Sequence, residues 1–128
     1  MRFQIYGKVY MVNLEELAQA ALDRDSLRLR SLTQDFLHEN PRVSDTTRPL
    51  TDNHRLLSTA AALIELFAQR LQQPAPSWTR DVGPLDEPFY LLESAMTLKR
   101  LRVLCETESP LPLRRRQLYA PPNFLEFA

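Results

Sequence analysis

The sequence predicts an all-α fold: a small bundle of four to five helices, followed by a proline-rich C-terminal arm. Three observations predict it. Apolar residues recur at helical spacing along most of the chain, the ten prolines fall mainly between these segments, and only two glycines are present. Prolines placed between helices stop them without breaking them, and so few glycines do not suit a turn-rich β fold. A length of 128 residues fits one domain with a single core.

Residues 1–12 are predicted as an N-terminal extension and hold the one strand-like stretch. Apolar and polar side chains alternate in part between Phe3 and Val9, with Gly7 in the middle. A strand needs a partner, so the stretch either turns at Gly7 into a tiny hairpin or adds to an edge on another subunit. In a third alternative, translation starts at Met11, because a helix cap follows it at once, and the first ten residues are accessory.

The bundle, residues 13–109, opens with a predicted pair of helices. Asn13 with a glutamate three residues later is typical of a capping box, and the first helix then runs to about Arg24. Asp25 or Ser26 caps a second helix, which the next proline ends. The inward positions are Leu14, Leu17, Ala18, Ala21 and Leu22 in the first helix, and Leu29, Leu32, Phe36 and Leu37 in the second.

The strongest helical pattern runs from Asn53 to Gln73, with Thr51 or Asp52 as its predicted cap. Its apolar arc is wider than a single stripe, which is typical of a central helix packed on two sides. Alanines at 60–62 permit close approach of a neighbouring helix, and a proline directly after Gln73 ends the segment.

The following loop contains the only tryptophan, Trp78, which we expect to close over the core as a lid rather than to act as a binding hot spot. A further helix is predicted to begin near Pro88, whose missing N–H is harmless at a helix start. Thr97 then caps a last helix, which Pro110 closes. Its inward residues are Leu98, Leu101, Leu104 and Cys105.

Residues 110–128 form the predicted C-terminal arm. Two phenylalanines, a tyrosine and three leucines follow Pro112, whereas loose tails are usually polar. Clustered apolar side chains are rarely left in water, so the arm must pack on the bundle or on a partner. We expect Tyr119, Phe124 and Phe127 to anchor it.

The charges balance to a formal net charge of zero, which disfavours strong non-specific nucleic-acid binding. Their distribution is uneven: acids dominate residues 14–39, and bases dominate residues 97–117. The run Arg114, Arg115, Arg116 is the sharpest polar feature, since arginine binds phosphate or carboxylate in a bidentate fork. In one interpretation the run is a patch that binds nucleic acid or the acidic surface of another protein. In the other it is a solvated basic turn that pairs with the acidic first hairpin of the same chain.

No motif predicts catalysis, a metal or a cofactor. His38 and His54 stand on different elements, and Cys105 has apolar neighbours, so no metal-ligand spacing or nucleophile–base pair is recognisable. The acidic pairs Glu15-Glu16 and Asp86-Glu87 suit helix N-termini. We therefore expect a protein that is not an enzyme and binds neither cofactor nor metal.

The lone cysteine excludes an internal disulfide and favours a reducing compartment. No apolar run approaches the ~20 residues of a membrane span, and no apolar leader is recognisable. We expect a cytoplasmic protein without membrane contact.

Several short motifs from about Pro74 onward carry a family resemblance. They are PSWT (76–79), VGP (82–84), EPFY (87–90), ESP (108–110), PLRRR (112–116) and APPNFLEFA (120–128). In these motifs the chain resembles a group of short, uncharacterised bacterial helical proteins that begin near the equivalent of Met11. Some are encoded beside nucleotidyltransferase-like proteins, so the resemblance implies a protein partner in a toxin–antitoxin or similar pair, and no catalytic residue.

Together these patterns predict a non-catalytic protein-binding module, with an antitoxin-like role as the neutralising partner of a bacterial enzyme or toxin. The partner is another protein or a second copy. The predicted contact residues are Arg114, Arg115, Arg116, Tyr119, Phe124 and Phe127.

The alternative is a nucleic-acid-binding transcriptional regulator that uses the basic Lys99–Arg116 region. Its contact residues are Lys99, Arg100, Arg102, Arg114, Arg115 and Arg116. If the arm is an interface, removal of residues 118–128 abolishes complex formation and leaves the bundle folded. If the arm belongs to the core, the same truncation unfolds the domain.

Overall fold

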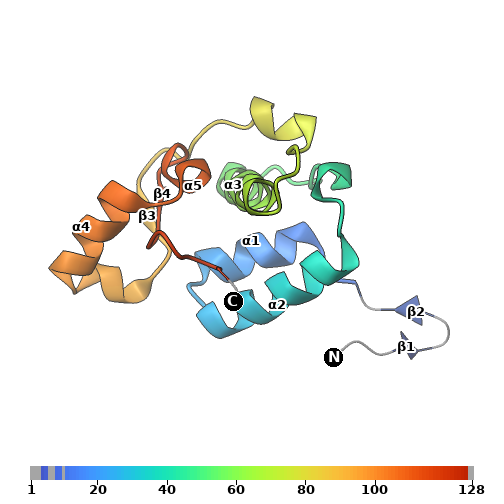
Figure 1. Ribbon diagram of the computed structural model, residues 1–128, viewed down its shortest axis with the longest axis horizontal. Helices are drawn as coiled ribbons and strands as arrows, with labels where there is room; N and C mark the ends of the chain where they lie inside the picture. The colour runs from blue at the N-terminus through green and yellow to red at the C-terminus, as the bar shows by residue number, and fades with distance from the viewer. Residues whose placement is uncertain (1–3, 6–7, 10, 127–128) are drawn as a thin grey trace.

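The structure is a computed structural model that describes residues 4–5, 8–9 and 11–126 (Figure 1). Within these ranges the fold is a small helical bundle, as predicted. The helices are α1 (Leu14–Leu22), α2 (Ser26–Glu39), α3 (His54–Arg70), α4 (Lys99–Glu108) and α5 (Leu111–Arg114), and the 3-10 turns are η1 (Val43–Asp45), η2 (Ser77–Asp81) and η3 (Glu93–Met96). The strands are β1 (Gln4–Ile5), β2 (Lys8–Val9), β3 (Phe89–Tyr90) and β4 (Leu118–Tyr119).

Helices α1, α2 and α3 begin at side-chain caps. Asn13 accepts the N–H of the third residue of α1 at 2.8 Å, and the side chain of that residue accepts the Asn13 N–H, which confirms the capping box. Asp25 caps α2, as one of the two predicted alternatives. The cap of α3 is Asn53, which accepts the Leu56 N–H at 3.1 Å, so the predicted caps Thr51 and Asp52 were placed too early.

Helices α1 and α3 both end on a left-handed residue that is not glycine. Arg24 and Gln72 each have a φ of 56°, and backbone bonds around them close Schellman motifs. A side chain in this conformation is strained, yet at Arg24 it reaches a second element. The Arg24 Nε donates to the carbonyl of Tyr90 at 2.8 Å, and its guanidinium lies 4.4 Å from the centroid of the Phe89 ring.

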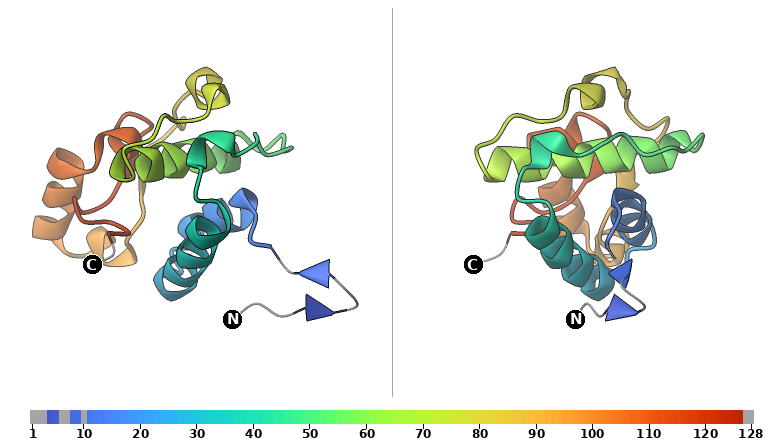
Figure 2. Two further views of the ribbon diagram at one scale, coloured as in Figure 1. Left: turned by 45° about the vertical axis from the view of Figure 1, so that its right-hand side comes forward. Right: turned by 90° about the vertical axis from the view of Figure 1, so that its right-hand side faces the viewer.

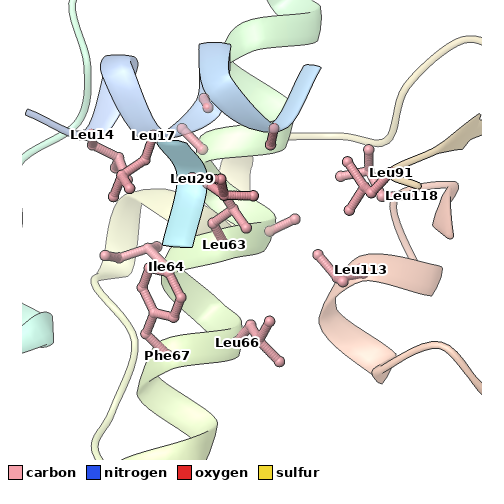
Figure 3. Packing of buried hydrophobic residues seen from close by; sticks show 14 of the residues in the cluster. Leu14, Leu17, Leu29, Leu63, Ile64, Leu66, Phe67, Leu91, Leu113 and Leu118 are labelled. Carbon is pink, nitrogen blue, oxygen red and sulfur yellow. The ribbon is translucent and has the colours of Figure 1, made fainter. Parts of the chain in front are cut away.

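Helix α3 lies at the centre of the molecule, between α1 on one side and α5 on another (Figures 1 and 2). Twelve of its residues are buried, and the alanines at 60–62 are fully so, which confirms the wide apolar arc. Figure 3 shows the leucines of α1, α2, α5 and β4 converging on it. The labelled residues of this core are Leu14, Leu17, Leu29, Leu63, Ile64, Leu66, Phe67, Leu91, Leu113 and Leu118.

Two strand pairs complete the fold. β1 and β2 are antiparallel, which agrees with the tiny-hairpin alternative for residues 1–12, although Gly7 lies outside the described residues. β3 and β4 are parallel and were not predicted. The helix predicted to begin near Pro88 is wrong, because the N–H groups of Phe89 and Leu91 donate to carbonyls beside and within β4, each at 2.9 Å.

The long loops are fixed to α3 and to each other. The half-buried Trp78 packs against the core and donates from Nε1 to the carbonyl of Thr46 at 2.8 Å, as expected of a lid. Gln73 accepts the Val43 N–H at 2.9 Å and donates to the carbonyl of Pro41 at 2.8 Å. The Gln73 bonds hold η1 beside the segment that follows α3, and the Trp78 bond links η2 to the residue after η1.

The described part of the predicted arm packs on the bundle and supplies core residues. Leu113, Leu118 and Ala120 are fully buried, and Phe124 is 8% exposed. Ser109 Oγ both donates to the Ala120 carbonyl and accepts the Ala120 N–H, at 2.9 Å each. The C-terminal segment is therefore continuous with the core around α3.

We expect that Leu118→Ala lowers the free energy of unfolding by about 2–5 kcal/mol, because it leaves a cavity in the core. Leu50→Ala is the matched control: Leu50 is 94% exposed, so its loss should stay within about 0.5 kcal/mol. Urea unfolding monitored by circular dichroism measures both. A chain ending at Gln117 should lack a cooperative transition, and a truncated chain that unfolds like the full-length protein would contradict the packing.

Candidate functional site

The three arginines of the predicted patch lie at the end of α5 and differ in their surroundings. Arg114 is exposed and donates to the carbonyl of Thr107 at 2.7 Å. The side chain of Arg115 is 53% exposed and that of Arg116 only 5%, and both reach Glu65 of α3. The described ion pairs of this run therefore go to the central helix, not to the acidic first hairpin.

Glu65 and Arg116 form a buried, bidentate ion pair. Arg116 Nη1 lies 2.5 Å from Oε1 of Glu65, and Nη2 lies 3.2 Å from Oε2. Nη2 also donates to the carbonyl of Thr79 in η2, at 2.8 Å. Arg115 Nη2 adds a second guanidinium at 2.6 Å from Oε1. One carboxylate thus holds two guanidinium groups and joins α3 to both η2 and the end of α5.

The environment of Glu65 keeps its carboxylate ionised. Burial acts to raise the pKa of Glu65, but hydrogen bonds from Arg116 and Arg115 outweigh it, and the pKa lies below its ordinary value. The carboxylate therefore serves as an anchor for the two arginines at neutral pH.

The cluster carries more positive than negative charge. Arg80 in η2 borders the same site and has no polar partner among the described residues. Arg116 Nε, fully buried, also has no acceptor in the described part of the chain. The cluster thus contains three guanidinium groups (Arg80, Arg115 and Arg116) and one carboxylate (Glu65). Two of its positive charges have no counter-ion within the cluster.

Two adjoining hollows open at this cluster, and both are bordered by Glu65, Arg80 and Arg115. One has a volume of about 460 Å³ and extends between the C-terminal half of α3 and Leu111 of α5. The other, of about 370 Å³, extends along η2 toward Pro84. We call the two hollows together the arginine groove. Its apolar walls include Ala68, Ala75, Pro76, Val82, Pro84, Leu111 and Pro112.

The aromatic residues predicted to contact a partner have mostly internal roles. Tyr119 is half-buried, with its ring centroid 5.4 Å from that of Tyr90. Phe124 is buried, and its carbonyl accepts a hydrogen bond from Arg70 of α3. Phe127 lies outside the described residues. Of the predicted contact set, Arg114 and Arg115 are the exposed members within the described ranges.

The residues of the nucleic-acid alternative are divided between two places. Lys99 and Arg100 are exposed at the start of α4. Arg102 donates to the carbonyls of Ala95 and Met96, at 3.0 and 2.5 Å, and so caps η3. Arg114 binds near the other end of α4, and ten helical residues span about 15 Å. The basic residues therefore do not form one continuous patch.

Other reactive side chains are held in the interior or by the backbone. Cys105 is fully buried, and burial raises the pKa of its thiol, which makes it a poor nucleophile. His54 Nε2 lies 2.8 Å from the carbonyl of Pro84. Among the described residues, no group of three or more His, Cys, Asp or Glu could hold a metal ion. Within the same ranges, no helix has the length and apolar character to cross a membrane.

Sequence reasoning missed Glu65, Arg80 and Leu111 as members of the site. Glu65 had a recognisable signal, because it is the one acid within the long apolar stretch of α3. A buried charge needs a partner, which would have directed attention to a distant arginine. Arg80 and Leu111 had no such signal in the sequence.

We expect that Glu65→Gln lowers the free energy of unfolding by about 3–5 kcal/mol at neutral pH, because Arg116 is left buried without its counter-ion. The folded-state pKa of Glu65 is lowered, so the stabilisation is present above the unfolded pKa of about 4.3 and is lost as the pH falls through the folded value. Urea unfolding at pH 7 and near pH 3 tests this.

The matched control is Glu87→Gln, which removes an exposed carboxylate in the loop before β3. Its effect at pH 7 should stay within about 0.5 kcal/mol. Equal losses in the two variants, or a loss for Glu65→Gln that does not shrink in acid, would contradict the role of the ion pair.

Comparison with known proteins identifies no relative of this chain. No protein-family model, no curated protein and no solved structure matches the chain. The function of the arginine groove is therefore inferred from its own residues.

Proposed function

We propose that the chain is a non-catalytic protein-binding module. In this proposal the arginine groove receives an acidic side chain of a partner protein, together with the apolar side chains that flank it. The carrying observation is the uncompensated positive charge of Arg80 and Arg115 at the rim, beside the exposed Leu111. Charge complementarity selects the occupant, because a carboxylate is the protein group that a guanidinium binds in a bidentate fork.

The side chains and backbone of the groove are partly ordered before a partner binds, which lowers the entropy cost of such a contact. Arg115 is already fixed through one hydrogen bond to Glu65, so part of its side-chain entropy is lost before binding. Pro76 and Pro112 restrict the backbone on the two sides of the larger hollow. A rigid arginine next to an apolar surface is typical of the residues that dominate binding energy in protein interfaces.

The leucine supplies the apolar part of the proposed contact. Leu111 is 55% exposed in the first position of α5, although the neighbouring Leu113 is fully buried. Burying the exposed part of a leucine and excluding water from the adjacent ion pair would both favour association.

The proposal assigns the charged groups a role in binding and none in a reaction. Glu65 is ionised and occupied by Arg115 and Arg116, and the thiol of Cys105 is buried and protonated. The finer prediction of a neutralised bacterial enzyme or toxin is supported only by the resemblance of the C-terminal motifs, and stays a prediction. The nucleic-acid alternative retains Lys99, Arg100 and Arg114 as exposed cations.

The test is affinity capture from the organism that encodes the chain, after nuclease treatment, with the captured proteins quantified by mass spectrometry. Wild-type chain should retain a protein that Arg80→Glu/Leu111→Asp retains at least about tenfold less, since the double variant removes more than 1.4 kcal/mol of binding energy. The matched control is Arg28→Glu/Leu27→Asp on α2, where both residues are exposed.

The control variant should bind like the wild type. Equal capture by the groove variant would contradict the proposal, as would the absence of any protein enriched by the wild type over background. In a parallel capture without nuclease, retention that is lost on nuclease treatment and falls steeply with salt would instead support the nucleic-acid alternative.

A further inference from the structure

Helix α4 is the outermost helix of the molecule and contributes little to its core. It lies at one edge in Figure 1 and in the left view of Figure 2. Its main packing partner is the short turn η3. Of its ten residues, Cys105 is the buried one. Such a short helix is marginal in water unless something else stabilises it.

The charges of α4 oppose its macrodipole at both ends. Lys99 and Arg100 stand in the first turn, where acids are favourable, and Glu106 and Glu108 stand in the last turn, where bases are favourable. Its cap residue, Leu98, provides no side-chain hydrogen bond. Each of these features weakens α4 as an isolated helix.

The other long helices follow the usual rule at one end. α1 has Glu15 and Glu16 in its first turn, α2 has His38 in its last turn, and α3 has Arg70 in its last turn. The reversal in α4 is therefore an exception within this chain. Its last turn receives one cation from outside the helix, because Arg114 donates to the Thr107 carbonyl, but its first turn contains no acid.

We propose that α4 pairs in antiparallel orientation with the α4 of a second copy of this chain. In that arrangement the basic N-terminal end of each helix meets the acidic C-terminal end of the other, so the first turn gains an acid and the last turn gains a base in addition to Arg114. A two-fold axis near Val103 produces this geometry, because an isologous interface pairs positions equally far before and after the axis.

The exposed side of α4 fits this pairing. Val103 is 47% exposed at the middle of the helix, and helical spacing places it on one face with Lys99, Arg100 and Glu106, away from the buried Cys105. This apolar side chain would meet its copy between the two sets of ion pairs. A second copy is the occupant that the charge pattern selects, because the pattern is complementary to itself when reversed.

The charged residues are free to take part. Lys99, Arg100 and Glu108 have no polar partner among the described residues. Glu106 accepts a hydrogen bond from the Tyr90 hydroxyl through Oε2, which leaves Oε1 for a cation. The proposal is independent of the arginine groove, since it uses neither Arg80 nor Leu111.

Sedimentation equilibrium of the full chain over a concentration series tests the pairing. The interface is small and mainly ionic, so we expect a weak dimer at about 20 mM salt that dissociates toward the monomer at about 500 mM, where charges are screened. Lys99→Glu/Arg100→Glu and Glu106→Lys/Glu108→Lys should each weaken self-association at least about tenfold, since like charges then face each other.

Mixing the two variants in equal amounts should restore a dimer, now of one acidic and one basic α4. Circular dichroism confirms that each variant is folded. The single variants Arg100→Glu and Glu108→Lys provide a second, milder pair for the same mixing experiment. A wild-type chain that remains monomeric throughout the series at low salt would overturn the proposal. So would a dimer that neither charge reversal weakens, or a mixture that does not associate.

Discussion

The buried ion pair between Glu65 and Arg116 is the constraint on which the rest of the structure depends. A carboxylate inside an apolar helix is costly unless a cation reaches it, and a buried guanidinium has the same requirement. Each group therefore needs the other, although 51 residues separate them. Once Arg116 is at α3, its neighbours Leu113 and Leu118 enter the core, and β4 comes beside β3.

The same carboxylate also shapes the surface. Oε1 of Glu65 holds the buried Arg116 and the half-exposed Arg115, so a stabilising interaction inside the fold positions a cation at its rim. The unpaired Arg80 and the exposed Leu111 complete a groove that is both basic and apolar. The run Arg114–Arg116 is therefore not a uniform basic patch: Arg116 is buried, and Arg114 and Arg115 are exposed. That division connects the stability of the domain to the function proposed for it.

Local signals in the sequence predicted α1, α2, α3 and α4, but they gave a wrong helix near Pro88 and missed the contacts between distant segments. The capping box at Asn13 and the wide apolar arc of α3 predicted elements that the structure confirms, because both depend on neighbours three or four residues away. The parallel pair β3–β4 was missed, since two residues per strand leave no periodicity to detect. Which arginine of the run is buried depends on where the run meets Glu65 in the folded chain, 51 residues away in sequence, and no local pattern contains that information.

Native-state hydrogen exchange of the full chain tests most directly that the C-terminal segment and α3 form one cooperative unit. The Ala120 N–H donates to Ser109, and the Phe89 N–H donates to the carbonyl of Gln117, so both amides report on that segment. We predict that they exchange with the same free energy as the Ile64 amide in α3, within about 0.5 kcal/mol. Exchange of these two amides through a smaller local opening, while Ile64 stays protected, would contradict this account.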